Sequence, residues 1–189
     1  NSLVSSCSYV GLTISSPSTY PISQAPTGSL NGMSETINNF SLPVEDGAVC
    51  SLVQLMGENG VVLFFYPKDM TSGCTREAED FAAAYQAFLD AGFNVVGISK
   101  DSVKSHQKFI EKHQLPFHLF ADVDTQVCQA LDVYKEKSMY GRTYMGVERS
   151  TFVIDPSLAI CQEWRKVKVP GHVEAVLACV KKLAEQNIE

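Results

Sequence analysis

The chain has 189 residues, a mass of 20.7 kDa and a formal net charge of −6, and 45% of its residues are hydrophobic. This length and apolar content predict a single domain with a sizeable core. The negative charge opposes sequence-independent binding to nucleic acid or anionic lipid, because both need a basic face. We expect small-molecule or protein partners, no nucleic acid, no membrane, and a monomer or weak homodimer.

The first 32 residues differ in composition from the rest of the chain. Residues 1–32 are dominated by Ser, Thr, Pro, Gly and Asn, which predicts a flexible N-terminal arm, whereas Met33 opens a globular pattern that predicts one domain over residues 33–189. No basic residue precedes Lys68, so this region lacks the positive segment of a secretory signal. Six cysteines without a CxxC pair favour a reducing compartment, and we expect the cytoplasm.

Apolar segments alternate between strand and helix patterns from residue 61 onward. The run Val61–Tyr66 predicts a strand covered on both faces and ended by Pro67, and it is far shorter than the roughly 20 residues that span a bilayer. Apolar residues at three- and four-residue spacings then predict a helix that stops at Gly92. The residues of its predicted buried face are Ala78, Phe81, Ala82, Tyr85, Phe88 and Leu89.

The remaining segments continue this alternation and close with an antiparallel pair of strands. Such βαβ units predict an α/β fold, an open sheet with a mixed edge, whose ligands gather at the carboxyl ends of the parallel strands. The predicted elements are a strand at 94–99, a helix begun at Asp101 and Ser102, a strand near 118–120, a short helix capped by Asp124, a loop at 134–148, strands at 151–154 and up to about 167 around a turn at 155–156, and a helix from Gly171 onward.

Cys74 lies between a turn rich in Pro, Ser, Thr and Gly and the opening of the first predicted helix. The thiolate is the reactive form of cysteine, and helix N-termini and neighbouring cations stabilise it. Thr71 and Ser72 are candidates for capping this helix, and Gly73 leaves backbone amides uncovered to face an anion. A lone cysteine is more often a small buried hydrophobic residue, so the choice between a structural and a reactive Cys74 depends on the surrounding motif.

The residues around Cys74 fit the pattern Pro-x-x-x-Thr-x-x-Cys, and several further stretches accompany it. On these motifs the chain, from about Glu35 to its end, resembles the peroxiredoxins and looks closest to the subfamily called peroxiredoxin Q or bacterioferritin comigratory protein. The resemblance implies a thioredoxin-like peroxiredoxin fold, with a central mixed β-sheet flanked by helices. The stretches that carry it are PKDMTSGC, VVLFFYPKD, TREAEDF, MYGRTYMGVERSTFVIDP, GISKDSVKSHQKF and LPFHLFADVD.

The resemblance also implies an active site and an activity. Cys74 aligns with the peroxidatic cysteine, Thr71 with the hydroxyl residue, Pro67 with the motif proline and Arg149 with the active-site arginine. Such an enzyme reduces hydrogen peroxide and organic hydroperoxides through a sulfenic acid, which thioredoxin, glutaredoxin or a small thiol recycles. We expect no metal and no organic cofactor.

Acidic residues follow Cys74 closely on the predicted helix. They favour the helix dipole but oppose a thiolate, so Arg149 has to outweigh them, with Lys68 and Arg76 as candidate helpers. These acidic residues are Glu77, Glu79 and Asp80.

A resolving cysteine is missing from the two places where the subfamily has one. Position 79, five residues after Cys74, is Glu79, and the matching position on the following helix is Ile110. Either an external thiol reduces the sulfenic acid, or another cysteine of the chain resolves it. Cys7, on the predicted arm, could reach Cys74. The remaining cysteines fit small core positions and are Cys50, Cys128, Cys161 and Cys179.

Other polar and aromatic residues have simpler interpretations. The histidines at 106, 113, 118 and 172 are scattered, so we interpret them as surface or core-edge residues rather than metal ligands. Ser72 and Ser102 fit helix caps better than nucleophiles. Tyr140, Tyr144 and Met145 fit either a substrate mouth near Arg149 or a packed loop.

Two other functions compete with a thiol peroxidase. A peroxide-sensing redox relay would use oxidised Cys74 to form mixed disulfides with a partner protein, and the missing resolving cysteine keeps this alternative open. A thioredoxin-like disulfide exchanger is disfavoured because that chemistry normally uses a CxxC pair.

Overall fold

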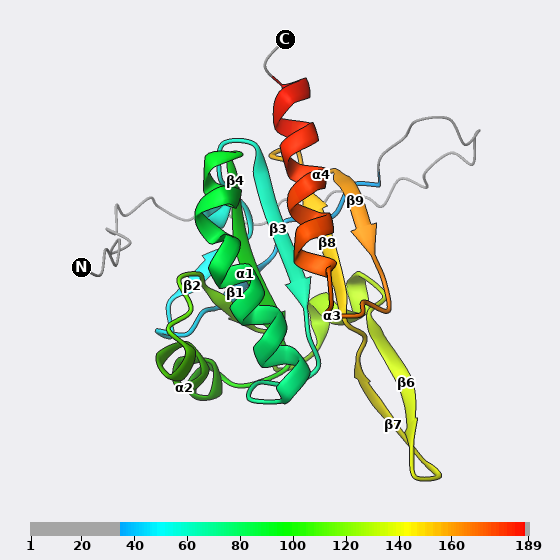
Figure 1. The fold of residues 1–189 in the computed structure, drawn as a ribbon. Coiled ribbons are helices and arrows are strands. Elements are labelled where there is room, and N and C mark those ends of the chain that lie inside the picture. Colours follow the sequence, from blue (N-terminus) through cyan, green and yellow to red (C-terminus); the bar gives the residue numbers. More distant parts are fainter. Residues whose placement is uncertain (1–34, 188–189) are drawn as a thin grey trace, which may run out of the picture. The chain divides into compact units, whose positions relative to one another are not determined.

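The computed structural model describes residues 35–187, whose central sheet has the strand order β5-β4-β3-β8-β9 (Figure 1). The predicted arm at residues 1–32, Cys7 included, lies outside the described residues. The strands of the sheet are β3 (Gly60–Phe65), β4 (Phe93–Ser99), β5 (Leu119–Ala121), β8 (Ser150–Ile154) and β9 (Ile160–Trp164).

The sheet is mixed, as the sequence predicts. Strand β3 runs parallel to β4, and β4 parallel to β5, whereas β8 pairs antiparallel with both β3 and β9. The closing antiparallel pair is therefore confirmed, with its turn built on Asp155, whose Oδ1 accepts hydrogen bonds from Ser157 and Ala159. Strand β9 ends earlier than predicted, at Trp164, because Lys166 adopts the left-handed conformation with a φ of 49°.

Helices α1 (Ser72–Asp90), α2 (Val103–His113) and α4 (His172–Gln186) contribute side chains to one of two hydrophobic cores. On the other core lie the short strands β1 (Ser41–Pro43) and β2 (Val49–Ser51), the 3₁₀ helix η1 (Val53–Leu55) and helix α3 (Gln126–Ala130). Alternate residues of β3 supply the two cores, which is why the apolar run of this strand is continuous. Val62 and Phe64 belong to the first core, and Val61, Leu63 and Phe65 to the second.

The helices form where the sequence predicts them, but some predicted details are wrong. Ser72, predicted as a cap, is the first residue of α1, because Thr71 occupies the N-cap position. Helix α1 is followed by Gly92 at a φ of 82°, and Ser102 caps α2 by accepting a hydrogen bond from the Ser105 amide, as expected. Leu89, however, was placed on the buried face of α1 and is 39% exposed. Asp124 does not cap the short helix, because Thr125 occupies the N-cap position in a left-handed conformation.

The segment predicted as a loop at 134–148 is a β-hairpin. Strands β6 (Tyr134–Met139) and β7 (Arg142–Val147) pair antiparallel and extend away from the central sheet (Figure 1). Its turn residues, Tyr140 and Gly141, both have positive φ, the geometry of a tight hairpin turn. The prediction failed because the two strands carry many polar residues and hold no continuous apolar run.

Within residues 35–187, no helix combines the length and the apolar character that a membrane crossing requires.

Candidate active site

The loop between β3 and α1 sets the position of Cys74. Met70 in this loop has a φ of 65°, a left-handed conformation that costs a non-glycine residue on the order of 1 kcal/mol. Thr71 then takes the N-cap position of α1 with extended backbone, and Cys74 follows as the third residue of the helix. Cys74 is 1% exposed, so its sulfur lies in a largely water-excluded place.

Thr71 stands where the sequence predicts a cap, but its side chain acts differently. Its hydroxyl donates a hydrogen bond of 2.9 Å to the Lys68 carbonyl and does not cap the helix. The hydroxyl hydrogen is used in that bond, so the oxygen can only accept from a further group. The amide of Thr75 makes the first bond of α1, to the Thr71 carbonyl, and the amides of residues 72–74 precede it.

Arg149 is brought to Cys74 by the pairing of strands β3 and β8. Phe65, the last residue of β3, lies opposite Ser150, the first residue of β8, so the segments just beyond them meet at one edge of the sheet. The Arg149 Nη2 lies 3.2 Å from the Cys74 Sγ, although 75 positions separate the two residues in sequence. A side chain at Gly73 would place its Cβ 3.2 Å from the same Nη2, so glycine leaves room for the guanidinium.

Glu77 binds the second terminal nitrogen of the Arg149 guanidinium. The Nη1 of Arg149 donates to the Glu77 Oε1 at 3.0 Å, and the glutamate side chain is fully buried. Burial raises the pKa of Glu77 to about 7, although the charge and hydrogen bond of Arg149 act in the opposite direction. Its Oε2 has no hydrogen-bond partner among the described residues. The sequence predicts Glu77 as a charge that favours the helix dipole and opposes the thiolate, and not as a partner of Arg149, although a spacing of three residues places it on the Cys74 face of α1.

The electrostatics around Arg149 keep it charged and keep its histidine neighbour neutral. Burial disfavours the charge of Arg149, but Glu77 and Cys74 outweigh burial and raise its pKa. His172 experiences both burial and the nearby guanidinium, which lower its pKa to about 4. Its Nε2 lies 2.7 Å from the Thr151 hydroxyl, so a neutral imidazole links α4 to β8 beside the site.

A second cation near Cys74 comes from the hairpin. The Lys137 ammonium on β6 donates to the Val147 carbonyl at 2.6 Å and interacts electrostatically with Cys74. Burial and the charge of Arg149 lower the pKa of Lys137. The sequence does not predict this lysine as a neighbour of Cys74, because its segment is predicted to be a loop. The predicted helpers of Arg149, Lys68 and Arg76, are both exposed.

The aromatic and sulfur residues of the hairpin do not form a packed loop. Tyr140 is 98% exposed at the turn, and Tyr144 and Met145 are each 44% exposed on β7. The packed-loop interpretation is therefore wrong. Their role at a substrate mouth stays a prediction.

The other cysteines of the described chain are not built like Cys74. Cys128 is fully buried, and burial together with Asp122 raises the pKa of its thiol. Burial also raises the pKa values of Cys161 on β9 and Cys179 on α4. Cys50 is 5% exposed in the second core. Cys50 and Cys128 therefore occupy the predicted core positions, and Cys161 packs against the first core while partly buried. Cys179 is also only partly buried and lies in neither core, so its predicted core role is wrong.

Neither place for a standard resolving cysteine offers a thiol. Glu79 is exposed and its Oε1 lies 3.0 Å from the His113 Nδ1. Ile110 is partly buried and packs against the first core.

Two of the histidines are more deeply placed than predicted. His106 is fully buried against Asp69, and His172 is 6% exposed, so neither is a surface residue. His113 and His118 fit the prediction better, since each is half-buried beside a glutamate. The described part of the chain contains no group of three or more His, Cys, Asp or Glu suited to a metal ion.

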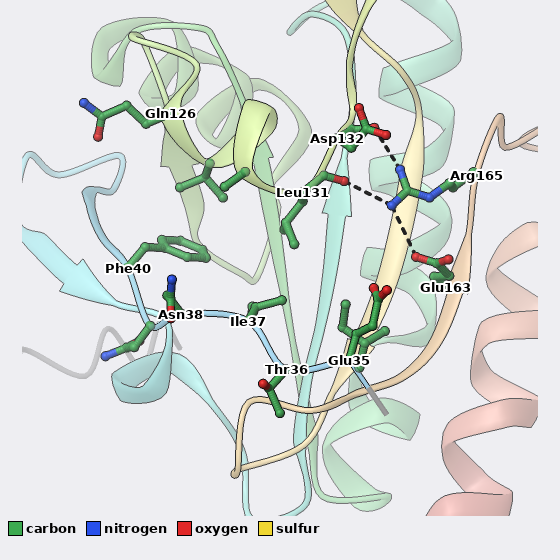
Figure 2. A pocket seen from close by; sticks show the side chains of 14 residues that line it. Glu35, Thr36, Ile37, Asn38, Phe40, Gln126, Leu131, Asp132, Glu163 and Arg165 are labelled. Carbon is green, nitrogen blue, oxygen red and sulfur yellow. Dashed lines mark hydrogen bonds and ion pairs between the residues drawn. The ribbon is translucent and has the colours of Figure 1, made fainter. Parts of the chain in front are cut away.

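A separate hollow of about 660 Å³ lies between residues 35–40, helix α3 and strand β9 (Figure 2). Arg165 crosses one side of it, donating to the carbonyls of Leu131 and Asp132 and to the Glu163 carboxylate. Within residues 35–187, the lining of this hollow includes neither Cys74 nor Arg149. It is therefore distinct from the cysteine site.

Comparison with known proteins assigns the chain and its fold to one family. Residues 33–162 match the model of the AhpC/TSA family, and the chain belongs to that family. Peroxiredoxin Bcp of Xanthomonas campestris pv. campestris is 46% identical over 148 residues, which are 78% of this chain and 92% of that protein. Peroxiredoxin Bcp of Bacillus subtilis is 41% identical over 157 residues, covering 77% of this chain and 100% of the relative.

Solved structures agree with the sequence relatives. Xanthomonas campestris peroxiredoxin Q superposes with a TM-score of 0.72 at 46% identity, covering 77% of this chain and 91% of that one. A second structure with a TM-score of 0.72 concerns the alkyl peroxide reduction activity of the bacterioferritin comigratory protein from the same organism, at 46% identity over 77% of this chain and 92% of that one. The chain has the thioredoxin-like peroxiredoxin fold and is a peroxiredoxin of the peroxiredoxin Q, or bacterioferritin comigratory protein, subfamily.

The buried Glu77 predicts a pH-dependent stability. Its pKa is about 7 in the folded protein and 4.5 in the absence of the fold, so the folded state binds the proton more tightly between these values. The stability contributed by this group is therefore present at low pH and lost as the pH rises toward 7. Glu77→Gln removes the titration, so its stability relative to wild type should increase by roughly 3 kcal/mol from about pH 4 to about pH 8.

Urea unfolding of both proteins across this pH range measures the difference. Because His172 titrates in both proteins, its contribution cancels. A difference in unfolding free energy that stays constant with pH would contradict the assignment.

Proposed function

We propose that the protein is a thiol-dependent peroxidase in which Cys74 is the peroxidatic cysteine. The observation that carries this proposal is the 3.2 Å contact between the Cys74 sulfur and the Arg149 guanidinium at the start of α1. A guanidinium at this distance favours a sulfur anion over a neutral thiol. The amides at the start of the helix add a partial positive charge on the same side.

The reaction follows from the chemistry of a thiolate beside a peroxide. The Cys74 sulfur attacks the terminal oxygen of hydrogen peroxide or of an organic hydroperoxide, and an S–O bond forms while the O–O bond breaks. The sulfur loses two electrons and becomes a sulfenic acid, and the departing hydroxide or alkoxide takes up a proton to give water or an alcohol. Arg149, held by Glu77, stabilises first the thiolate and then the negative charge on the leaving oxygen.

Thr71 and Pro67 would place the peroxide and the loop. Because the Thr71 hydroxyl gives its hydrogen to the Lys68 carbonyl, its oxygen is suited to accept the hydrogen of the incoming peroxide. Pro67, which directly follows β3 and Tyr66, limits the backbone where the loop leaves the sheet. We assign both residues to the active site together with Cys74 and Arg149.

The relatives support the substrate class. The Xanthomonas campestris protein is described by its alkyl peroxide reduction activity, and we extend this class, together with hydrogen peroxide, to the present chain. We further propose a catalytic domain over residues 33–189 with residues 1–32 as an extension, supported by a family match that begins at residue 33. A reducing compartment such as the cytoplasm suits an enzyme whose thiol must be regenerated.

An external thiol is the reductant that fits the described residues best. Two thiol equivalents reduce the sulfenic acid to the thiol, releasing water and leaving the reductant as a disulfide. Thioredoxin, glutaredoxin or a small thiol can supply these equivalents. The residues at the two standard resolving positions, Glu79 and Ile110, also support the second candidate, a redox relay in which oxidised Cys74 forms a mixed disulfide with a partner protein.

Substituting Arg149 by Met tests the charge that the proposal places on the sulfur. Loss of the guanidinium should slow the reaction of Cys74 with hydrogen peroxide by about 10²- to 10³-fold, the usual effect of removing one such donor. Single-turnover stopped-flow kinetics measures this step separately from recycling. Arg142→Met, which removes an equal charge from the exposed part of the hairpin, should change the rate little. Equal rates in wild type and Arg149→Met would refute the assignment.

Mass spectrometry after one equivalent of peroxide identifies the oxidised centre and any thiol that traps it. We expect a sulfenic acid on Cys74 in the wild type, trapped by a dimedone-type reagent, and no such adduct in Cys74→Ser. Turnover with thioredoxin or a small thiol should then follow. Oxidation of Cys74 without recycling by any thiol would favour the relay, and an unmodified Cys74 would contradict both functions.

A further inference from the structure

A buried polar network lies behind the loop that carries Thr71 and leads to Cys74. Asp69 in this loop is 4% exposed and accepts a hydrogen bond of 2.6 Å from the Tyr66 hydroxyl and one of 2.8 Å from the Ser105 hydroxyl. Its Oδ2 lies 2.7 Å from the Nδ1 of His106, and the side chains of this pair are 1% and 0% exposed. The proposed chemistry uses none of these side chains directly.

The partners of His106 fix the number of hydrogens in the network. The Nε2 of His106 lies 2.9 Å from the carbonyl oxygen of Phe120, which can only accept, so this nitrogen carries a hydrogen. A separation of 2.7 Å between Nδ1 and the Asp69 oxygen requires another hydrogen between them. The pair of side chains therefore carries no net charge, and both ring nitrogens of His106 have a hydrogen-bond partner. A buried polar network that is fully satisfied in this way is rigid.

The network joins the loop to elements that are distant in sequence. Ser105 and His106 belong to α2, and the Phe120 carbonyl belongs to β5. The Asp69 amide also donates to Asp101 at 2.9 Å, so both the backbone and the side chain of this residue are fixed. Met70, the next residue, has the left-handed backbone that needs surrounding contacts to persist.

We propose that Asp69 and His106 are positioning residues for the peroxidase reaction, which fix the 67–71 loop against α2 and β5 and so set the places of Thr71 and Cys74. This inference rests on the proposed function. The pair touches neither the peroxide nor the reacting sulfur. It fixes one end of the strained loop at Asp69, and the start of α1 fixes the other end. The Thr71 oxygen is thereby oriented to accept a hydrogen bond from the peroxide that Cys74 attacks.

A merely structural network would also lower stability when broken, so the test needs a readout that depends on geometry. Reaction of Cys74 with peroxide requires Thr71 and Arg149 to be aligned with the sulfur, whereas alkylation by iodoacetamide requires only a reachable thiolate. The ratio of the two rate constants therefore reports alignment, and a general loss of stability leaves it unchanged. Both rates are measured on the full chain, well below the melting temperature of each variant.

Asp69→Ala, His106→Leu and Tyr66→Phe break the network to different extents. The first two should lower the peroxide-to-iodoacetamide ratio about ten- to a hundredfold, the range in which small misplacements affect catalysis. Tyr66→Phe removes the hydroxyl that donates to Asp69 and lies 3.3 Å from the His106 Nδ1, but it leaves the Asp69–His106 pair in place, so it should lower the ratio less. Asp69→Asn should largely restore it, because its oxygen can accept from Tyr66 and its amide can donate to the Nδ1 of His106 and to the Ser105 oxygen.

Val61→Ala serves as the control for lost stability. Val61 is fully buried on the opposite core at the amino end of β3, far along the strand from the loop, and its truncation should lower the melting temperature without changing the ratio. Ratios for Asp69→Ala and Tyr66→Phe that match those of Val61→Ala would overturn the inference. A wild-type protein whose Cys74 does not react with peroxide would instead refute the proposed function, which keeps the two failures distinct.

Discussion

The site depends on one guanidinium shared between two acidic groups. Arg149 lies 3.2 Å from the Cys74 sulfur and 3.0 Å from the Glu77 carboxylate, and both partners are buried. Burial penalises a negative charge on either group, and the guanidinium between them offsets that penalty. His172 is neutral beside this group, whereas Arg149 and the half-buried Lys137 are cations that interact with the sulfur.

The order of strands explains why this contact forms at all. Strand β3 ends where the cysteine loop begins, and β8 starts directly after the arginine. Because the two strands are antiparallel neighbours with Phe65 opposite Ser150, the end of one and the start of the other coincide. The contact between Cys74 and Arg149 therefore follows from the pairing of two central strands, and the hydrogen bonds of Asp69 attach the intervening loop to α2.

The sequence predicts the central strands and the cysteine, but not the groups that tune it. The continuous apolar run of β3 and the helix that follows Cys74 are strong local signals. Lys137 was not predicted as a neighbour of Cys74, because the two strands of its hairpin carry many polar residues and no continuous apolar run, which predicts a loop. Glu77 was predicted only as a charge that favours the helix dipole and opposes the thiolate, and His106 only as a surface or core-edge residue. Burial of an ionisable side chain depends on which elements pack together and not on local pattern. Arg149 was placed correctly at the sulfur only through the family resemblance, because 75 positions separate the two residues.

The selectivity of Cys74 for peroxide tests this account most directly. Its second-order rate constant with hydrogen peroxide, divided by that with iodoacetamide, can be compared with the same quotient for free cysteine at one pH. A guanidinium that stabilises the leaving oxygen should raise the quotient of the wild-type protein at least about a hundredfold. A quotient equal to that of free cysteine would mean that the buried sulfur has no peroxide-specific environment, which contradicts the account.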